Sequence, residues 1–185
     1  FGLLLMFDEI QCGMGRTGKL FAHEWAGVTP DVMSVAKALG NGFPIGACLA
    51  TAKAARGMTP GTHGSTYGGN PLATAVGNAV LDVMTKPGFF EHVARMGDYL
   101  RKTLETLVAE HPKVFSGHRG KGLMQGLECV PENLGVVKAL RDEKLLAIAA
   151  GENVVRFLPA LIVTEKEIDE AAAMIGRAAA KLTGG

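Results

Sequence analysis

The chain has 185 residues and a formal net charge of +1, with 48% hydrophobic and 20% charged residues. This length and composition predict a folded globular protein with one large or two small domains. Because the Lys and Arg residues are scattered among acidic ones, we expect no nucleic-acid partner. The longest apolar runs, such as residues 3–7, fall far short of the roughly 20 residues that a transmembrane helix needs, so we expect no membrane segment.

The cysteines indicate the cellular compartment of the protein. The first residue indicates the position of the chain within a longer protein. Cys12, Cys48 and Cys129 are widely spaced and form neither a CxxC pair nor a zinc-ligand pattern. This use of cysteine predicts a reduced, cytoplasmic protein. The chain opens with Phe1 and not Met, without the charge pattern of a signal peptide. We therefore expect it to begin inside a longer protein.

Three strands are predicted in the first part of the chain. Residues 3–7 form an apolar run that ends at Asp8-Glu9, as a buried parallel strand does at its carboxyl end. The other strands are expected at residues 31–36, just before Lys37, and at residues 45–51, after a turn at 40–44. A glycine-rich loop at 61–71 then leads into a helix over about 72–84.

The pattern of apolar and polar residues changes after the break at residues 86–88. Apolar residues at helical spacing predict a long amphipathic helix over 89–109. Thr164 and Glu167 form the capping-box pattern at the start of the last helix. The remaining elements are strands near 114–116, 122–129 and 153–157 and helices near 134–143 and 165–182. We predict two α/β domains, residues 1–87 and 88–185.

A glycine-rich stretch at residues 13–18 matches GxGxxG, and with Lys19 it also matches GxxxxGK. Both patterns suggest nucleotide binding. Five residues separate the predicted strand from the first glycine, however, and Leu20 stands where a P-loop needs Ser or Thr. A nucleotide-binding domain therefore stays an alternative that the motif supports only weakly.

Asp8 and Lys37 follow two successive predicted strands. Pyridoxal chemistry needs a lysine amine to carry the cofactor aldehyde as a Schiff base, and an acid to keep the pyridine nitrogen protonated. Asp8 and Lys37 supply both groups, and strand alternation would place Ile10 on the same face as Asp8. The alternatives are a capping or surface acid for Asp8 and a solvated lysine for Lys37.

Two further positions carry binding chemistry. Ser65 and Thr66 lie in the loop at residues 61–71, whose glycines and hydroxyls resemble an anion cradle before a helix. Arg156 interrupts an apolar strand, and its planar guanidinium suits a carboxylate. A flexible connecting loop and a structural salt bridge are the respective alternatives.

Four motifs in this order resemble the class III aminotransferases over the whole chain. They are FDEIQ at residues 7–11, GRTG at 15–18, Lys37, and GSTYGGNP at 64–71. The resemblance implies a pyridoxal 5′-phosphate (PLP) enzyme of the α/β class. Its large domain is doubly wound around the cofactor, and a small α/β domain forms the C-terminus. It also implies a homodimer that acts on amino acids and 2-oxo acids.

The resemblance assigns roles to individual residues. Asp8 matches the acid at the pyridine nitrogen, Ile10 the residue against the ring, and Lys37 the Schiff-base lysine. Gln11 matches the contact to the phenolic oxygen, and Arg156 the arginine that binds the substrate carboxylate. Two further cofactor-loop positions are Ser65 and Thr66, of which Thr66 matches the threonine that reaches the phosphate of the partner subunit's cofactor. No metal is implied.

The strings at residues 11–21 and 62–67 resemble family members that transfer the δ-amino group of N2-acetylornithine to 2-oxoglutarate, a step of arginine biosynthesis. Ornithine, succinyldiaminopimelate and 4-aminobutyrate are alternative amino donors. The family's N-terminal half, which supplies a phosphate loop and a ring-stacking aromatic residue, is absent from this chain. An inactive fragment is therefore the alternative from a different functional class.

Overall fold

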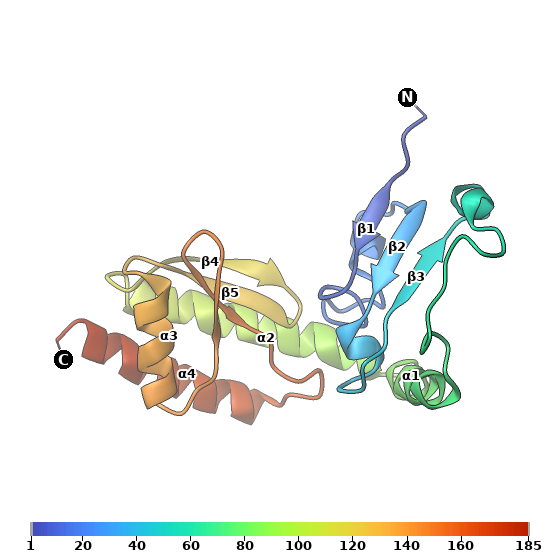
Figure 1. Ribbon diagram of the computed structural model, residues 1–185. Helices are drawn as coiled ribbons and strands as arrows, with labels where there is room; N and C mark the ends of the chain where they lie inside the picture. Colours follow the sequence, from blue (N-terminus) through green and yellow to red (C-terminus); the bar gives the residue numbers. More distant parts are fainter. Residues whose placement is uncertain (1, 185) are drawn as a thin grey trace. The chain divides into compact units, whose positions relative to one another are not determined.

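The computed structural model describes residues 2–184, and the chain forms two compact units (Figure 1). One unit extends to Phe90, and the other begins at Glu91. The outer limits of the two predicted domains, Phe1 and Gly185, lie outside the described residues. Their assignment as a cofactor domain and a small C-terminal domain stays a prediction.

The first unit contains a three-stranded mixed sheet. Its strands are β1 (Met6–Asp8), β2 (Val32–Val35) and β3 (Ala47–Ala50), in the order β1-β2-β3. β1 pairs parallel with β2, and β3 pairs antiparallel with β2. The three predicted strands are confirmed, each shorter than its sequence pattern indicated. The mixture of helices and strands also agrees with the predicted α/β class.

Helical segments connect and follow this sheet. Three are short 3-10 helices: η1 (Ala22–Trp25), η2 (Lys37–Leu39) and η3 (Ala54–Gly57). The predicted helix is α1 (Pro71–Met84). It begins where Asn70 Oδ1 accepts a hydrogen bond from Ala73 N at 2.9 Å, with Pro71 in the first turn. This is a typical helix N-terminus. The Asn70 side chain caps a backbone N–H, and Pro71 has no backbone N–H at a position where the helix offers no acceptor for one.

The expectation that residues 3–7 form a buried strand is wrong for the described structure. The side chain of Leu3 is 84% exposed and that of Met6 is 68% exposed. Among the described strands, β1 lies at the edge of the sheet and pairs with β2. The apolar run that predicted burial therefore lies uncovered, although its parallel pairing was predicted correctly.

The second unit is an antiparallel sheet with three helices. The strands are β4 (Phe115–Lys121), β5 (Met124–Cys129), β6 (Ile148–Ala150) and β7 (Val154–Phe157), in the order β4-β5-β7-β6. The helices are α2 (Phe89–Glu110), α3 (Asn133–Asp142) and α4 (Glu165–Leu182). The sequence predicted all of these except β6.

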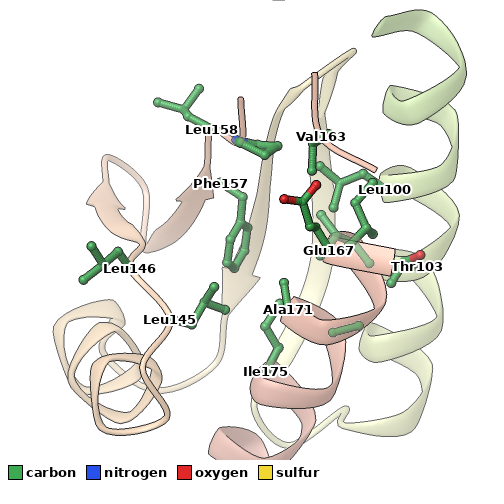
Figure 2. Close-up of a pocket in the computed structure, with 14 residues that line it drawn as sticks. Leu100, Thr103, Leu145, Leu146, Phe157, Leu158, Val163, Glu167, Ala171 and Ile175 are labelled. Atoms are coloured by element: carbon green, nitrogen blue, oxygen red, sulfur yellow. The ribbon is translucent and has the colours of Figure 1, made fainter. Parts of the chain in front are cut away.

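One face of this second sheet packs against α2 and α4. Gln125 and Phe157 are register neighbours on that face. Gln125 Nε2 donates to the backbone oxygen of Gly97 in α2 at 2.7 Å. Phe157 lines an apolar cavity (Figure 2) together with Leu100 of α2 and Ile175 of α4. The core of the unit lies between the sheet and the helices, and α3 contributes the buried Val136 and Leu140 to it.

Candidate functional site

Asp8 and Lys37 leave the first sheet at the same edge. Asp8 is the last residue of β1, and its register partner is Ser34 in β2. Lys37 follows β2 by two residues, and both side chains are exposed. Because β1 and β2 are parallel, their carboxyl ends meet at one edge, which is where α/β folds hold their ligands. The structure thus brings the predicted acid and amine to one edge.

The backbone of Lys37 adopts an unusual conformation. Its φ is 46°, in the left-handed region that side-chain-bearing residues rarely occupy. The turn that follows holds this conformation, because Gly40 N and Asn41 N both donate to the Lys37 oxygen at 3.1 Å. Such a conformation costs on the order of 1–3 kcal/mol and is found preferentially at functional sites. This observation supports a special role for Lys37.

Ile10 and Gln11 lie in a turn that begins directly after β1. Strand alternation therefore does not position Ile10 as we expected, because the strand has already ended at Asp8. Instead, Ile10 N donates to Asp8 Oδ1 at 2.9 Å. This bond ties the Asp8 carboxylate to the turn. The predicted contacts of Ile10 and Gln11 with the cofactor stay predictions.

Glu9, between Asp8 and Ile10, has a role that the sequence did not reveal. Its side chain is only 2% exposed, whereas that of Asp8 is exposed. Backbone hydrogen bonds from Ala22 (2.9 Å) and His23 (2.8 Å) reach its carboxylate. Burial raises the pKa of Glu9, but these bonds outweigh burial and leave the pKa below its ordinary value. The sequence carried no signal for this role, because these donors are backbone groups 13 and 14 residues away.

The glycine-rich stretch at residues 13–18 forms a series of turns. Gly15 and Gly18 adopt positive φ values of 84° and 94°. The next helix is the four-residue 3-10 helix η1, and no α-helix follows this stretch before α1. The nucleotide-binding alternative needs a helix N-terminus directly after the loop, so the structure does not support it.

Ser65 and Thr66 lie in the exposed loop before α1. Ser65 Oγ accepts a hydrogen bond from Gly68 N at 2.9 Å, which makes a local turn. Asn70 Nδ2 donates to the Tyr67 oxygen at 2.8 Å and continues this turn into the helix cap. The loop therefore has local order. Its predicted contact with a phosphate stays a prediction.

Arg156 belongs to the second unit and lies in β7. Its register partners on neighbouring strands are Gly126 and Ile148. Because side chains alternate along a strand, Arg156 lies on the face opposite to Phe157. The cavity in Figure 2 is lined mainly by apolar residues that include Phe157, so the guanidinium of Arg156 lies outside it. A side chain at position 126 would meet Val154 Cγ1 at 2.5 Å, so the glycine there allows close packing beside Arg156.

The first unit fits the ring end of PLP. Asp8 supplies a carboxylate for the pyridine nitrogen, and Lys37 supplies an amine for the aldehyde, at one sheet edge. Among residues 2–184, no group of three His, Cys, Asp or Glu side chains could hold a metal ion. Within the same range, no helix is both long enough and apolar enough to span a membrane.

Comparison with known proteins identifies the family. The sequence profile of the family described as "Aminotransferase class-III" matches residues 1–179. The chain belongs to this family. Acetylornithine aminotransferase 1 of Bradyrhizobium diazoefficiens is 61% identical over 182 residues, which cover 98% of this chain and 45% of the relative. This class-III aminotransferase chain therefore spans less than half the length of the curated relatives it matches.

Solved structures of aminotransferases also resemble the chain. N-acetylornithine aminotransferase from Stenotrophomonas maltophilia has a TM-score of 0.85 and 38% identity, and the match covers 97% of this chain and 48% of that structure. Ornithine aminotransferase from Toxoplasma gondii, which holds PLP in partial occupancy at its active site, has a TM-score of 0.89 and 34% identity. That match covers 98% of this chain and 44% of the other. The α/β fold predicted for this class-III aminotransferase is thereby confirmed.

Proposed function

We propose that the protein containing this chain is a PLP-dependent acetylornithine aminotransferase. The reaction transfers the δ-amino group of N2-acetylornithine to 2-oxoglutarate and yields N-acetylglutamate semialdehyde and glutamate, a step of arginine biosynthesis. The observation that carries the proposal is the meeting of Asp8 and Lys37 at the carboxyl edge of β1 and β2. The 61% identity to a relative named acetylornithine aminotransferase supports the choice of amino donor.

Bound PLP supplies an electron sink that stabilises negative charge on the substrate carbon. The Asp8 carboxylate accepts the hydrogen bond of the protonated pyridine nitrogen and so keeps that proton in place. The Lys37 amine takes the proton from the substrate carbon that bears the amino group. With PLP bound, the same amine would return the proton to the carbon on the cofactor side, so that Lys37 would serve as general base and general acid.

Other residues bind and orient in this proposal. Arg156 receives the substrate carboxylate with its planar guanidinium, while Ile10 packs against the ring and Gln11 contacts its phenolic oxygen. Thr66, with Ser65 beside it, reaches the phosphate of the partner subunit's cofactor in a homodimer. The three free cysteines support a cytoplasmic location.

The decisive experiment replaces Lys37 with alanine in the complete protein. Lys37→Ala is expected to fold and to lose transamination of N2-acetylornithine by several orders of magnitude, because it removes the amine proposed to react with the cofactor aldehyde and to move the proton. The measurement is single-turnover formation of glutamate from 2-oxoglutarate. Lys53→Ala, at an exposed lysine of the same unit, is the control and should retain wild-type turnover.

Two outcomes would contradict the proposal. Near-normal turnover in Lys37→Ala would show that Lys37 is not the reacting amine. A wild-type protein that converts ornithine or 4-aminobutyrate much faster than N2-acetylornithine would leave the aminotransferase chemistry intact and overturn the choice of substrate.

A further inference from the structure

Glu9 lies at the centre of the segment that contains the proposed cofactor contacts. Asp8 precedes it, and Ile10 and Gln11 follow it. The Glu9 backbone is itself fixed, because its N–H donates to the Ser34 oxygen at 2.9 Å and its oxygen accepts from Gly13 N at 3.0 Å. The first bond extends the β1–β2 pairing toward Lys37, and the second closes the turn. Any movement of Glu9 therefore moves the neighbouring contacts.

The Glu9 side chain binds the loop that returns toward the sheet. Oε1 lies 2.8 Å from His23 N and 3.2 Å from His23 Nδ1. Oε2 lies 2.9 Å from Ala22 N and 3.3 Å from Cys12 Sγ. The carboxylate thereby connects the turn after β1 with the start of η1. Its burial makes these bonds strong, because water does not compete for the oxygens.

These partners require an acid at position 9. The backbone N–H groups of Ala22 and His23 can only donate, and they face different oxygens of the carboxylate. A glutamine would turn its NH2 group toward one of them and so oppose two donors in a buried place. An unsatisfied buried donor is costly, so the loop would have to move.

We infer that Glu9 is a positioning residue: its buried carboxylate holds the turn after β1 so that Asp8 and Gln11 face the cofactor correctly. This inference rests on the proposed function. Glu9 touches neither substrate nor cofactor and acts through its neighbours. The Ile10 N to Asp8 Oδ1 bond transmits the effect, since it joins the same turn to the Asp8 carboxylate.

The test uses the complete protein and PLP itself as the probe. Glu9→Gln is expected to raise the dissociation constant for PLP at least about tenfold, the loss of one charged hydrogen bond. It should also shift the visible absorption band of the bound cofactor, because Asp8 would no longer be aligned with the pyridine nitrogen. Glu9→Asp keeps the acceptors and should recover part of both properties.

Glu143→Gln is the matched control. Glu143 is a carboxylate of the second unit that accepts from Arg177 Nε and Lys181 Nζ. This control variant should lower the melting temperature without changing PLP affinity or the absorption band. It separates a positioning effect of Glu9 from a general loss of stability.

A second variant keeps the inference testable if Glu9→Gln does not fold. Ala22→Pro removes one donor to Glu9 Oε2 at the first residue of η1, where proline is tolerated. It should change affinity and absorption in the same direction by a smaller amount. Native affinity and absorption in Ala22→Pro, or in a folded Glu9→Gln, would overturn the role of Glu9. A wild-type protein that binds no PLP would overturn the proposed function first.

Discussion

At the scale of single residues, Cys12 and Cys48 have different surroundings. Cys48 is exposed on β3, whereas Cys12 is half-buried in the turn after β1. The Cys12 thiol donates to Glu9 Oε2 at 3.3 Å. Burial, together with the hydrogen bond and negative charge of Glu9, raises the pKa of Cys12 to about 11. The thiol of Cys12 is therefore protonated at neutral pH.

Slow alkylation of Cys12 is the expected consequence. The thiolate is the reactive form, and at pH 7.5 on the order of one Cys12 in a few thousand carries it. In the folded complete protein, iodoacetamide should leave Cys12 unmodified at this pH, and the rate should rise as the pH approaches 11. Peptide mapping by mass spectrometry measures it, with the urea-unfolded protein as control. Equal rates in folded and unfolded protein would contradict the protection.

At the scale of elements, the start of α4 shows how local sequence determines structure. Thr164 Oγ1 accepts from Glu167 N at 3.4 Å, and Glu167 Oε2 accepts from Thr164 N at 2.8 Å. This reciprocal pair is the capping box that the sequence predicted. It satisfies donors that the first turn of a helix would otherwise leave without partners.

Removal of this cap should destabilise the protein measurably. Thr164→Ala is expected to lower the free energy of unfolding by about 1 kcal/mol, the usual effect of losing a threonine N-cap. Chemical denaturation of the complete protein gives the value. Thr106→Ala, at an exposed threonine inside α2, removes only a bond to the Lys102 oxygen and should be nearly neutral. A Thr164→Ala effect no larger than that of Thr106→Ala would contradict the assignment.

Elements with local signals were predictable from sequence, and those without were not. The periodic apolar residues of α2 and the cap of α4 gave correct boundaries within a residue or two. β4 continues to Lys121, beyond the three residues predicted, because Gly117 and Gly120 obscure its pattern. β6 was missed because a three-residue edge strand has too few positions to show alternation.

The candidate site was predictable to the same extent. Asp8 ends one strand and Lys37 follows the next, and both strands have a clear apolar pattern, so their common edge could be expected. Glu9 could not be assigned a role, because its partners Ala22 and His23 lie 13 and 14 residues away and donate through their backbone. Every residue except proline has a backbone N–H, so the residue types at these positions do not indicate which of them donates to Glu9.

At the scale of the whole molecule, the chain spans 45% of its curated relative and leaves apolar residues uncovered. Met6 in the edge strand β1 is exposed, and so are Leu3 and Leu4 in the segment before it. An exposed apolar edge offers unpaired backbone groups and invites association.

We therefore expect the 185-residue chain alone to be a poor aminotransferase. With added PLP, it should convert N2-acetylornithine far more slowly than the complete protein, because an incompletely held cofactor loses the effective molarity that alignment provides. It should also self-associate in light scattering after size-exclusion chromatography. The complete protein, tested in parallel, is the control. Comparable single-turnover rates for both proteins would show that this chain is self-sufficient.

The left-handed backbone of Lys37 has a consequence for protein engineering. At φ 46° glycine is the residue that the backbone prefers, and a lysine is kept there against that preference. A stability-guided redesign would therefore select Lys37→Gly, and the variant should melt at a higher temperature than Lys37→Ala. Such a redesign would improve the fold and remove the amine on which the proposed chemistry depends. Position 37 should accordingly be held fixed in any stabilised version of this protein.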